Sequence, residues 1–449
     1  MKKASLALAV AAGTLGLTLG NVAHAAFIED STAKLDLRNF YFNNDIRDTD
    51  SPSNKEWGQA FQLNLQSGFT EGTVGFGVDA LGLLGVKLDS GGRTNKAGRS
   101  RTPGVLFPTD SDNSAVDEFS SLGLTGKIRV SKTVAHVGTL QPKLPVVTFN
   151  DGRLIPQTFE GAQITSNEID NLTLVAGQLE HAKGRTSSNA ESLAIAGAGA
   201  GADSNKFYYG GADYKINKDL LVQYYYGNLD DFYKQHFLGL THTLALGAGS
   251  LKSDLRYFDT GSDGKNSSAA GRADGYLGSG YYGRNALGNG ITTGEVDNRT
   301  WSAFFTYSLE GHALSAGYQQ VSGDSNFIQL NQGSIPGQGG ATTYLITDRQ
   351  ITNFGRAGER TWITQYGYDF GKIGVPGLTA NVLYMKGDNI KSATGDLKEW
   401  ERDLTVSYVL QEGAMKGLGF AWRNASLRSQ PGGDIDQNRL IVSYSIPLL

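Results

Sequence analysis

The sequence lacks cysteine entirely and has only ten prolines and six histidines in 449 residues. Without cysteine there are no disulfides and no thiolate metal sites, so packing and hydrogen bonds must hold the fold together. The histidines are scattered without metal-ligand spacing, and no phosphate-binding loop, dinucleotide fingerprint or nucleophile elbow is present. We therefore expect no cofactor, no metal and no catalytic activity.

Long apolar runs are also missing after the N-terminus. The apolar stretch "ASLALAVAAGTLGLTL" follows Lys2 and Lys3 and precedes Ala23-His24-Ala25. This order is typical of a secretory signal peptide. The alternative interpretation is an uncleaved membrane anchor, but the apolar run is shorter than the roughly 20 residues that a membrane helix needs. We expect residues 1–25 to be cleaved and residues 26–449 to form the mature domain. Cleavage changes the formal net charge from −4 to −6, so no overall basic character points to nucleic acid.

Glycine and aromatic residues are abundant, with 60 glycines, 20 tyrosines and 20 phenylalanines, which is typical of β-structure with many turns. In "AFQLNLQ", Phe61, Leu63 and Leu65 alternate with polar residues. About 18 such segments follow one another, joined by short turns such as "NKD" and by long loops in alternation, with no domain boundary. This pattern predicts an all-β transmembrane antiparallel barrel with short periplasmic turns and long extracellular loops.

A soluble β-sandwich would show the same alternation of polar and apolar residues. Two observations favour the membrane barrel. Aromatic residues such as Trp57, Trp301 and Trp362 lie near strand ends, as in interfacial girdles. A ring of about 18 strands also leaves a lumen too wide for side chains to fill, so its inward face should be polar. The sequence thus predicts a barrel in a Gram-negative outer membrane. A secreted β-rich binding protein and a barrel enzyme are the alternatives, and no nucleophile–base pair supports the enzyme.

Basic residues occur on the face of the strands that points into the predicted lumen. In "GLTGKIRVSKT", Leu124, Ile128 and Val130 suit lipid, which places Lys127 and Arg129 on the opposite face. A cation on the lipid face near the midplane costs about 2–4 kcal/mol, so this parity indicates inward side chains. The same argument predicts four further inward cations: Arg38, Arg256, Arg423 and Arg439.

Closure of the barrel places the last strand beside the first, so Arg423, Arg439 and Arg38 should lie on three adjacent strands. Their positions along the strands predict a diagonal row of cations descending from the outer rim. A row of weak sites would admit and release anions, as conduction requires. The alternative is that each cation pairs with a lumenal carboxylate such as Asp36 or Asp79.

The segments "FIEDSTAKLDLRNFYFNND", "SGFTEGTVGFGVDALGLLGVKLD", "GKIRVSKT" and "DGRLIPQTFEG" resemble the OprD-like outer-membrane carboxylate channels, over essentially the whole mature chain. The resemblance implies an 18-stranded monomer, often weakly trimeric, narrowed by inward-folded third, fourth and seventh outer loops. It also implies a lumenal basic ladder that guides carboxylates, with Lys127, Arg129 and Arg423 at matching positions and Arg153 near the constriction. Ala421 stands where some members carry a second arginine, so the ladder should be shorter there.

The seventh loop bears on the substrate. Members that take basic amino acids carry a Tyr-x-Asp-Phe stretch, where this chain has "ITNF" with Ile351 and Asn353. A neutral amide brings no charge, and charge-assisted hydrogen bonds are roughly twice as strong as neutral ones. We therefore expect Asn353 at the substrate path and a cyclic or aromatic monocarboxylate as the substrate. A channel for basic amino acids and peptides is the alternative, if Asp348 or Glu359 replaces the lost acid.

The expected partners follow from this interpretation. They are small carboxylates, outer-membrane lipid and lipopolysaccharide, the outer-membrane assembly machinery and a weak homotrimer, and no nucleic acid.

Overall fold

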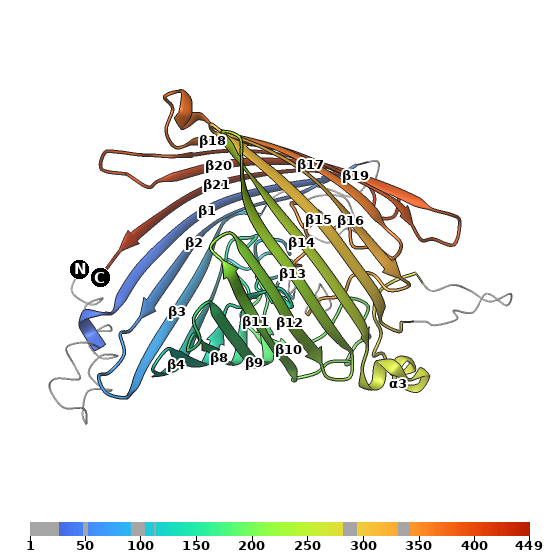
Figure 1. The fold of residues 1–449 in the computed structure, drawn as a ribbon, viewed down its shortest axis with the longest axis horizontal. Helices are drawn as coiled ribbons and strands as arrows, with labels where there is room; N and C mark the ends of the chain where they lie inside the picture. The colour runs from blue at the N-terminus through green and yellow to red at the C-terminus, as the bar shows by residue number, and fades with distance from the viewer. Residues whose placement is uncertain (1–26, 48–52, 91–103, 112–113, 282–293, 331–341) are drawn as a thin grey trace.

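The computed structural model describes residues 27–47, 53–90, 104–111, 114–281, 294–330 and 342–449. The expected signal peptide, residues 1–25, lies outside these ranges and stays a prediction. In the described residues, 19 strands form one antiparallel sheet that closes where β21 (Ile435–Pro447) pairs with β1 (Thr32–Ile46). Figure 1 shows the blue β1 beside the red β21. The short β10 pairs only with the end of β9, so the barrel wall has 18 strands, as predicted.

The other wall strands follow one another around the barrel in chain order. They are β2 (Asn54–Gln66), β3 (Val74–Asp89), β4 (Glu118–Val130), β5 (Thr133–Leu140), β8 (Thr158–Ser166), β9 (Leu172–Lys183), β11 (Phe207–Asn217), β12 (Leu220–Leu229), β13 (Tyr233–Leu246), β14 (Gly249–Ser262), β15 (Asp297–Leu309), β16 (His312–Gly323), β17 (Arg360–Asp369), β18 (Leu378–Ile390), β19 (Leu397–Val409) and β20 (Gly419–Ser429).

The remaining elements are short and belong to the connections between the wall strands. They are β6 (Lys143–Leu144), β7 (Val147–Thr148), β10 (Ala190–Ser192), the 3-10 helices η1 (Gly264–Ser267) and η2 (Phe370–Ile373), and α3 (Ala269–Ala273). No helix in the described ranges is both long and apolar enough to cross a membrane.

Alternation along the strands sorts the side chains as predicted, because successive residues point to opposite faces of the sheet. On β4, Leu122 and Leu124 are 71% and 57% exposed on the outer face, while Lys127 on the inner face is 8% exposed. Two-residue turns join several strands at the periplasmic rim. Glu310 and Gly311, between β15 and β16, both have positive φ (47° and 89°), as a type I′ hairpin requires.

The long connections lie at the opposite rim, although some connections at this rim are short. Loop 2 (90–117), loop 3 (141–157), loop 4 (184–206), loop 6 (263–296) and loop 7 (324–359) are long, whereas residues 230–232 between β12 and β13 form a short turn. Parts of loops 2, 6 and 7 are outside the described residues. Figure 1 shows loop segments inside the ring of strands, so the loops occupy part of the lumen.

The expectation of a uniformly polar inward face is wrong. Loops 3, 4 and 7 fold into the barrel and bury an apolar cluster against the inner face of β8–β14. Its members include Val146, Val147, Leu193, Ile195, Phe207, Tyr225, Phe237, Phe258, Phe327 and Leu345. Loop side chains fill this part of the lumen together with side chains of the wall. Apolar inward residues are therefore buried against the loops and are not exposed to water.

Two smaller clusters fill further sectors. Loop 2 and the end of loop 3 cover Phe40, Phe42 and their neighbours on β1–β4. Loop 7 places Ile346 and Phe354 on β17 and β18. Few of the inward residues of β19–β21 and of the periplasmic half of β1 belong to an apolar cluster, and this side of the lumen carries inward charged residues such as Arg38, Arg423 and Arg439.

Candidate functional site

The cationic wall consists of Arg38, Arg423 and Arg439 on β1, β20 and β21. These strands are adjacent, as barrel closure predicted. Arg423 lies directly opposite Arg439 in the strand register, and Arg38 lies opposite Ser443, farther toward the periplasmic rim. The predicted diagonal row of three cations therefore has only two levels, because Arg423 and Arg439 lie at the same height and Arg38 lies below them.

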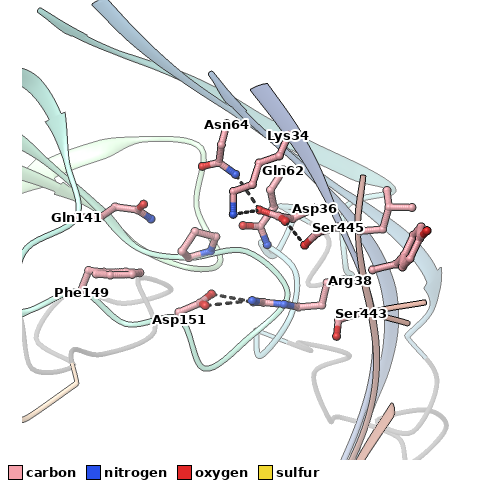
Figure 2. Close-up of a pocket in the computed structure, with 14 residues that line it drawn as sticks. Lys34, Asp36, Arg38, Gln62, Asn64, Gln141, Phe149, Asp151, Ser443 and Ser445 are labelled. Carbon is pink, nitrogen blue, oxygen red and sulfur yellow. Dashed lines mark hydrogen bonds and ion pairs between the residues drawn. The ribbon is translucent and has the colours of Figure 1, made fainter. Parts of the chain in front are cut away.

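Arg38 holds loop 3 against the barrel wall. Its Nη1 and Nη2 donate to the two carboxylate oxygens of Asp151 at 2.7 and 3.0 Å (Figure 2). Nη1 also donates to the Arg153 carbonyl oxygen at 2.8 Å. A bidentate guanidinium–carboxylate pair restricts both groups to one orientation. Asp36, which the sequence analysis named as a possible partner of the lumenal cations, pairs with Lys34 at 2.9 Å. Arg38 thus positions the loop, and Asp151 neutralises its charge.

Arg439 is held by uncharged groups. Its Nε donates to Gln437 Oε1 at 2.7 Å and its Nη2 to the loop 7 carbonyl oxygen of Gln350 at 2.5 Å. The side chain is buried, and the ring of Phe42 lies 5.8 Å from its guanidinium and 5.0 Å from that of Arg153. Among the described residues no carboxylate lies within ion-pair distance of Arg439, so its charge is oriented but not neutralised.

Arg423 is the exposed member of the cationic wall. Within the part of the chain that the structure describes, its side chain makes no hydrogen bond and no ion pair. Arg38, Asp151 and Asp403 are close enough for their charges to act on it. A guanidinium that is exposed, inward and without a fixed partner can exchange water for a passing anion.

Three acids on the inner face of β19 were missed by the sequence analysis: Glu399, Glu401 and Asp403, which are 2%, 0% and 8% exposed. Glu401 accepts hydrogen bonds from the loop 7 amides of Gln350, Ile351 and Thr352 at 3.2, 2.9 and 3.0 Å. Glu399 accepts from Ser429. These acids hold loop 7 to the wall. Their alternation with Trp400 and Arg402 in "EWERD" was the signal that could have revealed them.

The loops add charges that no sequence period could reveal. Desolvation lowers the pKa of Arg153 to about 10, against the opposing effect of the Glu56 carboxylate. It lowers the pKa of Arg185 in loop 4 well below the usual range, and repulsion from Arg153 acts in the same direction. Desolvation also raises the pKa of Asp348 in loop 7 to about 6, although the Thr343 amide and hydroxyl donate to its carboxylate at 2.6 and 2.8 Å. Loops 3 and 4 therefore bring the guanidinium groups of Arg153 and Arg185 close enough for their charges to act on each other.

The β4 wall, Lys127 and Arg129, lies near the periplasmic rim. Lys127 Nζ lies 2.6 Å from Asp79 Oδ1 and donates to the Ser67 carbonyl oxygen at 2.7 Å. Arg129 is exposed and its guanidinium lies 4.5 Å from the centre of the Phe69 ring. No carboxylate among the described residues pairs with Arg129. The alternative pairing with Asp79 thus holds for Lys127 only.

Arg256 on β14 is a neutralised cation. It donates to both oxygens of Asp254 at 2.9 and 2.6 Å and to the Tyr344 carbonyl oxygen at 3.0 Å, and it stacks on the Tyr344 ring at 4.1 Å. These contacts hold the described part of loop 7 to β14, so Arg256 positions a loop.

Asn353 is part of a tight turn of loop 7. Its Oδ1 accepts from the Gly355 amide at 3.1 Å, and its carbonyl oxygen accepts from the Thr347 hydroxyl at 2.6 Å. The suggested replacement acids are also used inside the loop. Asp348 binds Thr343, and the fully buried Glu359 accepts from the Arg356 amide at 3.0 Å. Neither of them replaces the acid missing at position 353 with an exposed carboxylate.

A cavity of about 350 Å³ lies beside the Arg38–Asp151 pair. Figure 2 shows Gln141, Phe149 and Asp151 of loop 3 on one side, facing strand residues on the other. The strand side is polar, with Lys34, Asp36, Gln62, Asn64, Ser443 and Ser445. The cavity has space for a small solute on the periplasmic side of the cationic wall. No group of three or more acidic or histidine side chains in the described residues could hold a metal ion.

Comparison with known proteins places this arrangement in context. A family model described as outer membrane porin, OprD family, matches residues 25–448. The porin-like protein GalP of Pseudomonas putida is 36% identical over 427 residues, covering 94% of this chain and 93% of GalP. The crystal structure of Pseudomonas aeruginosa OccK8 (OprE) is 60% identical with a TM-score of 0.86 and covers 95% of this chain and 100% of that chain. The structure of Pseudomonas aeruginosa OpdK with vanillate is 34% identical with a TM-score of 0.80, covering 94% and 100%.

Proposed function

The chain belongs to the OprD family of outer membrane porins, and from that premise we propose that it is a passive channel selective for small carboxylates, with cyclic or aromatic monocarboxylates preferred. The observation that carries the proposal is Arg423. It is an exposed inward guanidinium without a fixed partner among the described residues, on the side of the lumen that the loop clusters leave polar.

Selection starts from the narrowed lumen. Loop 3 is held by Arg38 and loop 7 by Glu401 and Arg256, so the constriction is built from ion pairs and charge-assisted hydrogen bonds. Such contacts hold a loop in one position more firmly than neutral contacts do. A solute must therefore pass close to the cationic wall, where charge acts at short range.

The fixed charges at this wall favour an anion. Arg423 and Arg439 lie opposite one another in the register, and the structure pairs neither with a carboxylate in its described part. Two neighbouring guanidinium groups repel each other, and a carboxylate between them relieves the repulsion. Because Arg423 stays exposed to water, the carboxylate is bound weakly enough to leave again, as conduction requires.

Loop 7 supports the preference for monocarboxylates without a cationic group. The turn at Asn353 carries no charge, and neither Asp348 nor Glu359 replaces the missing acid with an exposed carboxylate. An ammonium or guanidinium group would thus find no free carboxylate on this part of the loop. The relative OpdK was solved with vanillate, an aromatic carboxylate, which agrees with the preference proposed for this chain.

A channel for basic amino acids is the alternative, and the acids of β19 are the feature that could favour it. All three are buried, and Glu401 uses both oxygens to bind loop 7 amides. They are thus unavailable to a solute. A secreted binding protein does not agree with membership of a porin family, and the relatives found are porins rather than enzymes.

Uptake into liposomes that contain the purified protein tests the proposal. Benzoate should enter faster than arginine at equal concentration, and planar bilayers under a potassium chloride gradient should show a reversal potential of anion-selective sign. Acetate and glycerol serve as controls for size and charge. Faster entry of arginine than of benzoate would refute the assignment of substrate class.

A further inference from the structure

A group of cations lies on the lipid-facing side of the barrel, at the outer ends of β17–β19. We call Arg360, Lys386, Lys398 and Arg402 the outer basic patch, and all four are exposed. The pore chemistry described above does not use them, because strand alternation points them away from the lumen. On β19, for example, Arg402 points outward between the buried inward acids Glu401 and Asp403.

The register brings the patch together. Lys386 lies opposite Trp362 on β17 and Trp400 on β19, while Arg360 lies opposite Asp388 and Arg402 lies opposite Tyr384. Arg360 and Arg402 are therefore diagonal neighbours of Lys386 on its two sides. Diagonal neighbours in a sheet are about 7–8 Å apart, within reach of a shared ligand for such long side chains.

The patch is not neutralised by the protein. Arg402 Nη2 donates to Asn424 Oδ1 at 2.8 Å and Ser426 Oγ at 3.2 Å, both uncharged acceptors. The carboxylates nearby include Asp388, half-buried opposite Arg360, the exposed Asp396, and Asp434 and Asp436, which pair with Arg428. In the described residues none of them forms an ion pair with a patch member, which leaves like charges side by side.

Aromatic side chains mark the level of the patch in the membrane. Trp362 and Tyr384 are exposed on the same face, and Tyr384 lies 5.9 Å from Trp400 between ring centres. Such residues lie at the boundary between hydrocarbon and headgroups. The patch is thus at headgroup height, on the outer leaflet side, where phosphates of lipid headgroups are the abundant anions.

The opposite sector of the barrel has the reverse charge. At the outer ends of β4, β8 and β9, the outward exposed residues Glu118, Glu160 and Glu180 occupy the corresponding level. Outward cations elsewhere at the outer rim, such as Lys206 and Arg299, pair with Asp230 and Asp259. The patch differs from them because its members form no ion pair in the described residues.

We propose that the outer basic patch binds the phosphate groups of a phosphorylated glycolipid in the outer leaflet. Guanidinium and ammonium groups form charge-assisted hydrogen bonds with phosphate oxygens, and the indole and phenol rings pack against the sugar and upper acyl region. One phosphate shared by Lys386 and Arg402 relieves the repulsion between the two cations. The lipid would thereby be held beside β17–β19, the strands to which loop 7 is attached.

Native mass spectrometry of the full protein in detergent tests the proposal. The probes are bisphosphorylated lipid A, its dephosphorylated analogue and inorganic phosphate. The test variant is R360Q/K386Q/R402Q, and the matched control K206Q/K234Q/R299Q removes three exposed outer-rim cations outside the patch. Heat-modifiable mobility on gels confirms that each variant is a folded barrel, and the single K386Q variant provides a milder second test.

Wild type and control should bind the bisphosphorylated lipid equally, the triple patch variant about tenfold less and K386Q to an intermediate degree. The dephosphorylated lipid should bind weakly to all, and inorganic phosphate should not remain bound. Equal lipid retention by the patch variant and wild type, an equal loss in the control variant, or retention of the dephosphorylated lipid would each overturn the proposal.

Discussion

The β4 wall and the cationic wall both place cations inside the barrel, and within each wall the cations have different roles. Each contains one cation tied to a carboxylate, Lys127 to Asp79 and Arg38 to Asp151. Each also contains one exposed cation that pairs with no carboxylate in the described residues, Arg129 and Arg423. The inward parity of a cation thus establishes where it points, and its partner decides whether it attracts solutes or holds the structure.

The tied pairs also differ from one another. Lys127 and Asp79 lie on neighbouring strands, so their pairing is within the wall. Arg38 reaches Asp151 on loop 3, which lies 113 residues away in sequence. The first pair stabilises the rim, whereas the second pair positions a loop that narrows the lumen.

Removing both exposed cations should have the largest effect. Each charge, acting over roughly 10 Å through an effective dielectric of about 20, contributes roughly 1.7 kcal/mol, and 1.4 kcal/mol is about tenfold. We expect R129S/R423S to lower benzoate uptake by at least about tenfold and to shift the reversal potential away from anions. The effect should shrink in 1 M salt, where the Debye length is about 3 Å. An unchanged reversal potential would mean that these two residues do not set selectivity.

Removing a tied pair without changing net charge isolates its structural role. R38Q/D151N should release loop 3 and raise single-channel conductance about two- to fivefold, with little change in ion selectivity. The reason is that a charge-assisted bidentate contact is lost while the net charge stays constant. The matched control K127Q/D79N removes a pair within the wall and should leave conductance nearly unchanged. Equal conductance of the two double variants would contradict a loop-positioning role for Arg38.

Adding an acid on loop 7 should change the preferred solute. Asn353→Asp keeps an oxygen that accepts from the Gly355 amide and adds one negative charge. We expect arginine uptake to rise about two- to threefold, because charge-assisted contacts are roughly twice as strong as neutral ones. Asn353→Ala, which loses the hydrogen bond and adds no charge, is the control. A similar rise in that variant would attribute the change to loop mobility instead of charge.

The smallest expected effect concerns pH and loop 7. The pKa of Asp348 is raised to about 6 by desolvation, so the folded loop binds this proton more tightly than an unfolded chain, whose usual value is 3.8. Its contribution to loop stability is therefore fully present below about pH 4 and is lost as the pH rises to about 6. Brief closures in single-channel records should be more frequent at pH 7 than at pH 5. Asp348→Asn should remove this difference, and its persistence would assign it to another group.

Much of the barrel could be predicted from residue alternation. A strand has a period of two, so the inward direction of Arg38, Arg256, Arg423 and Arg439 followed from their apolar neighbours. The acids Glu399, Glu401 and Asp403 obey the same rule and were recoverable from "EWERD". Loop residues such as Arg185 and Asp348 have no period, and their roles could not be predicted.

The sequence by itself determined the strands, their number, the facing of their side chains and the neighbourhood of the first and last strands. Only the tertiary structure decided which inward cations are neutralised, which acids hold loop 7 and how the loops fill the lumen. The physical reason is the distance along the sequence over which each feature is determined. Strand alternation is set by the backbone geometry of adjacent residues, whereas the partner of Arg38 is chosen by a loop that folds back across the barrel.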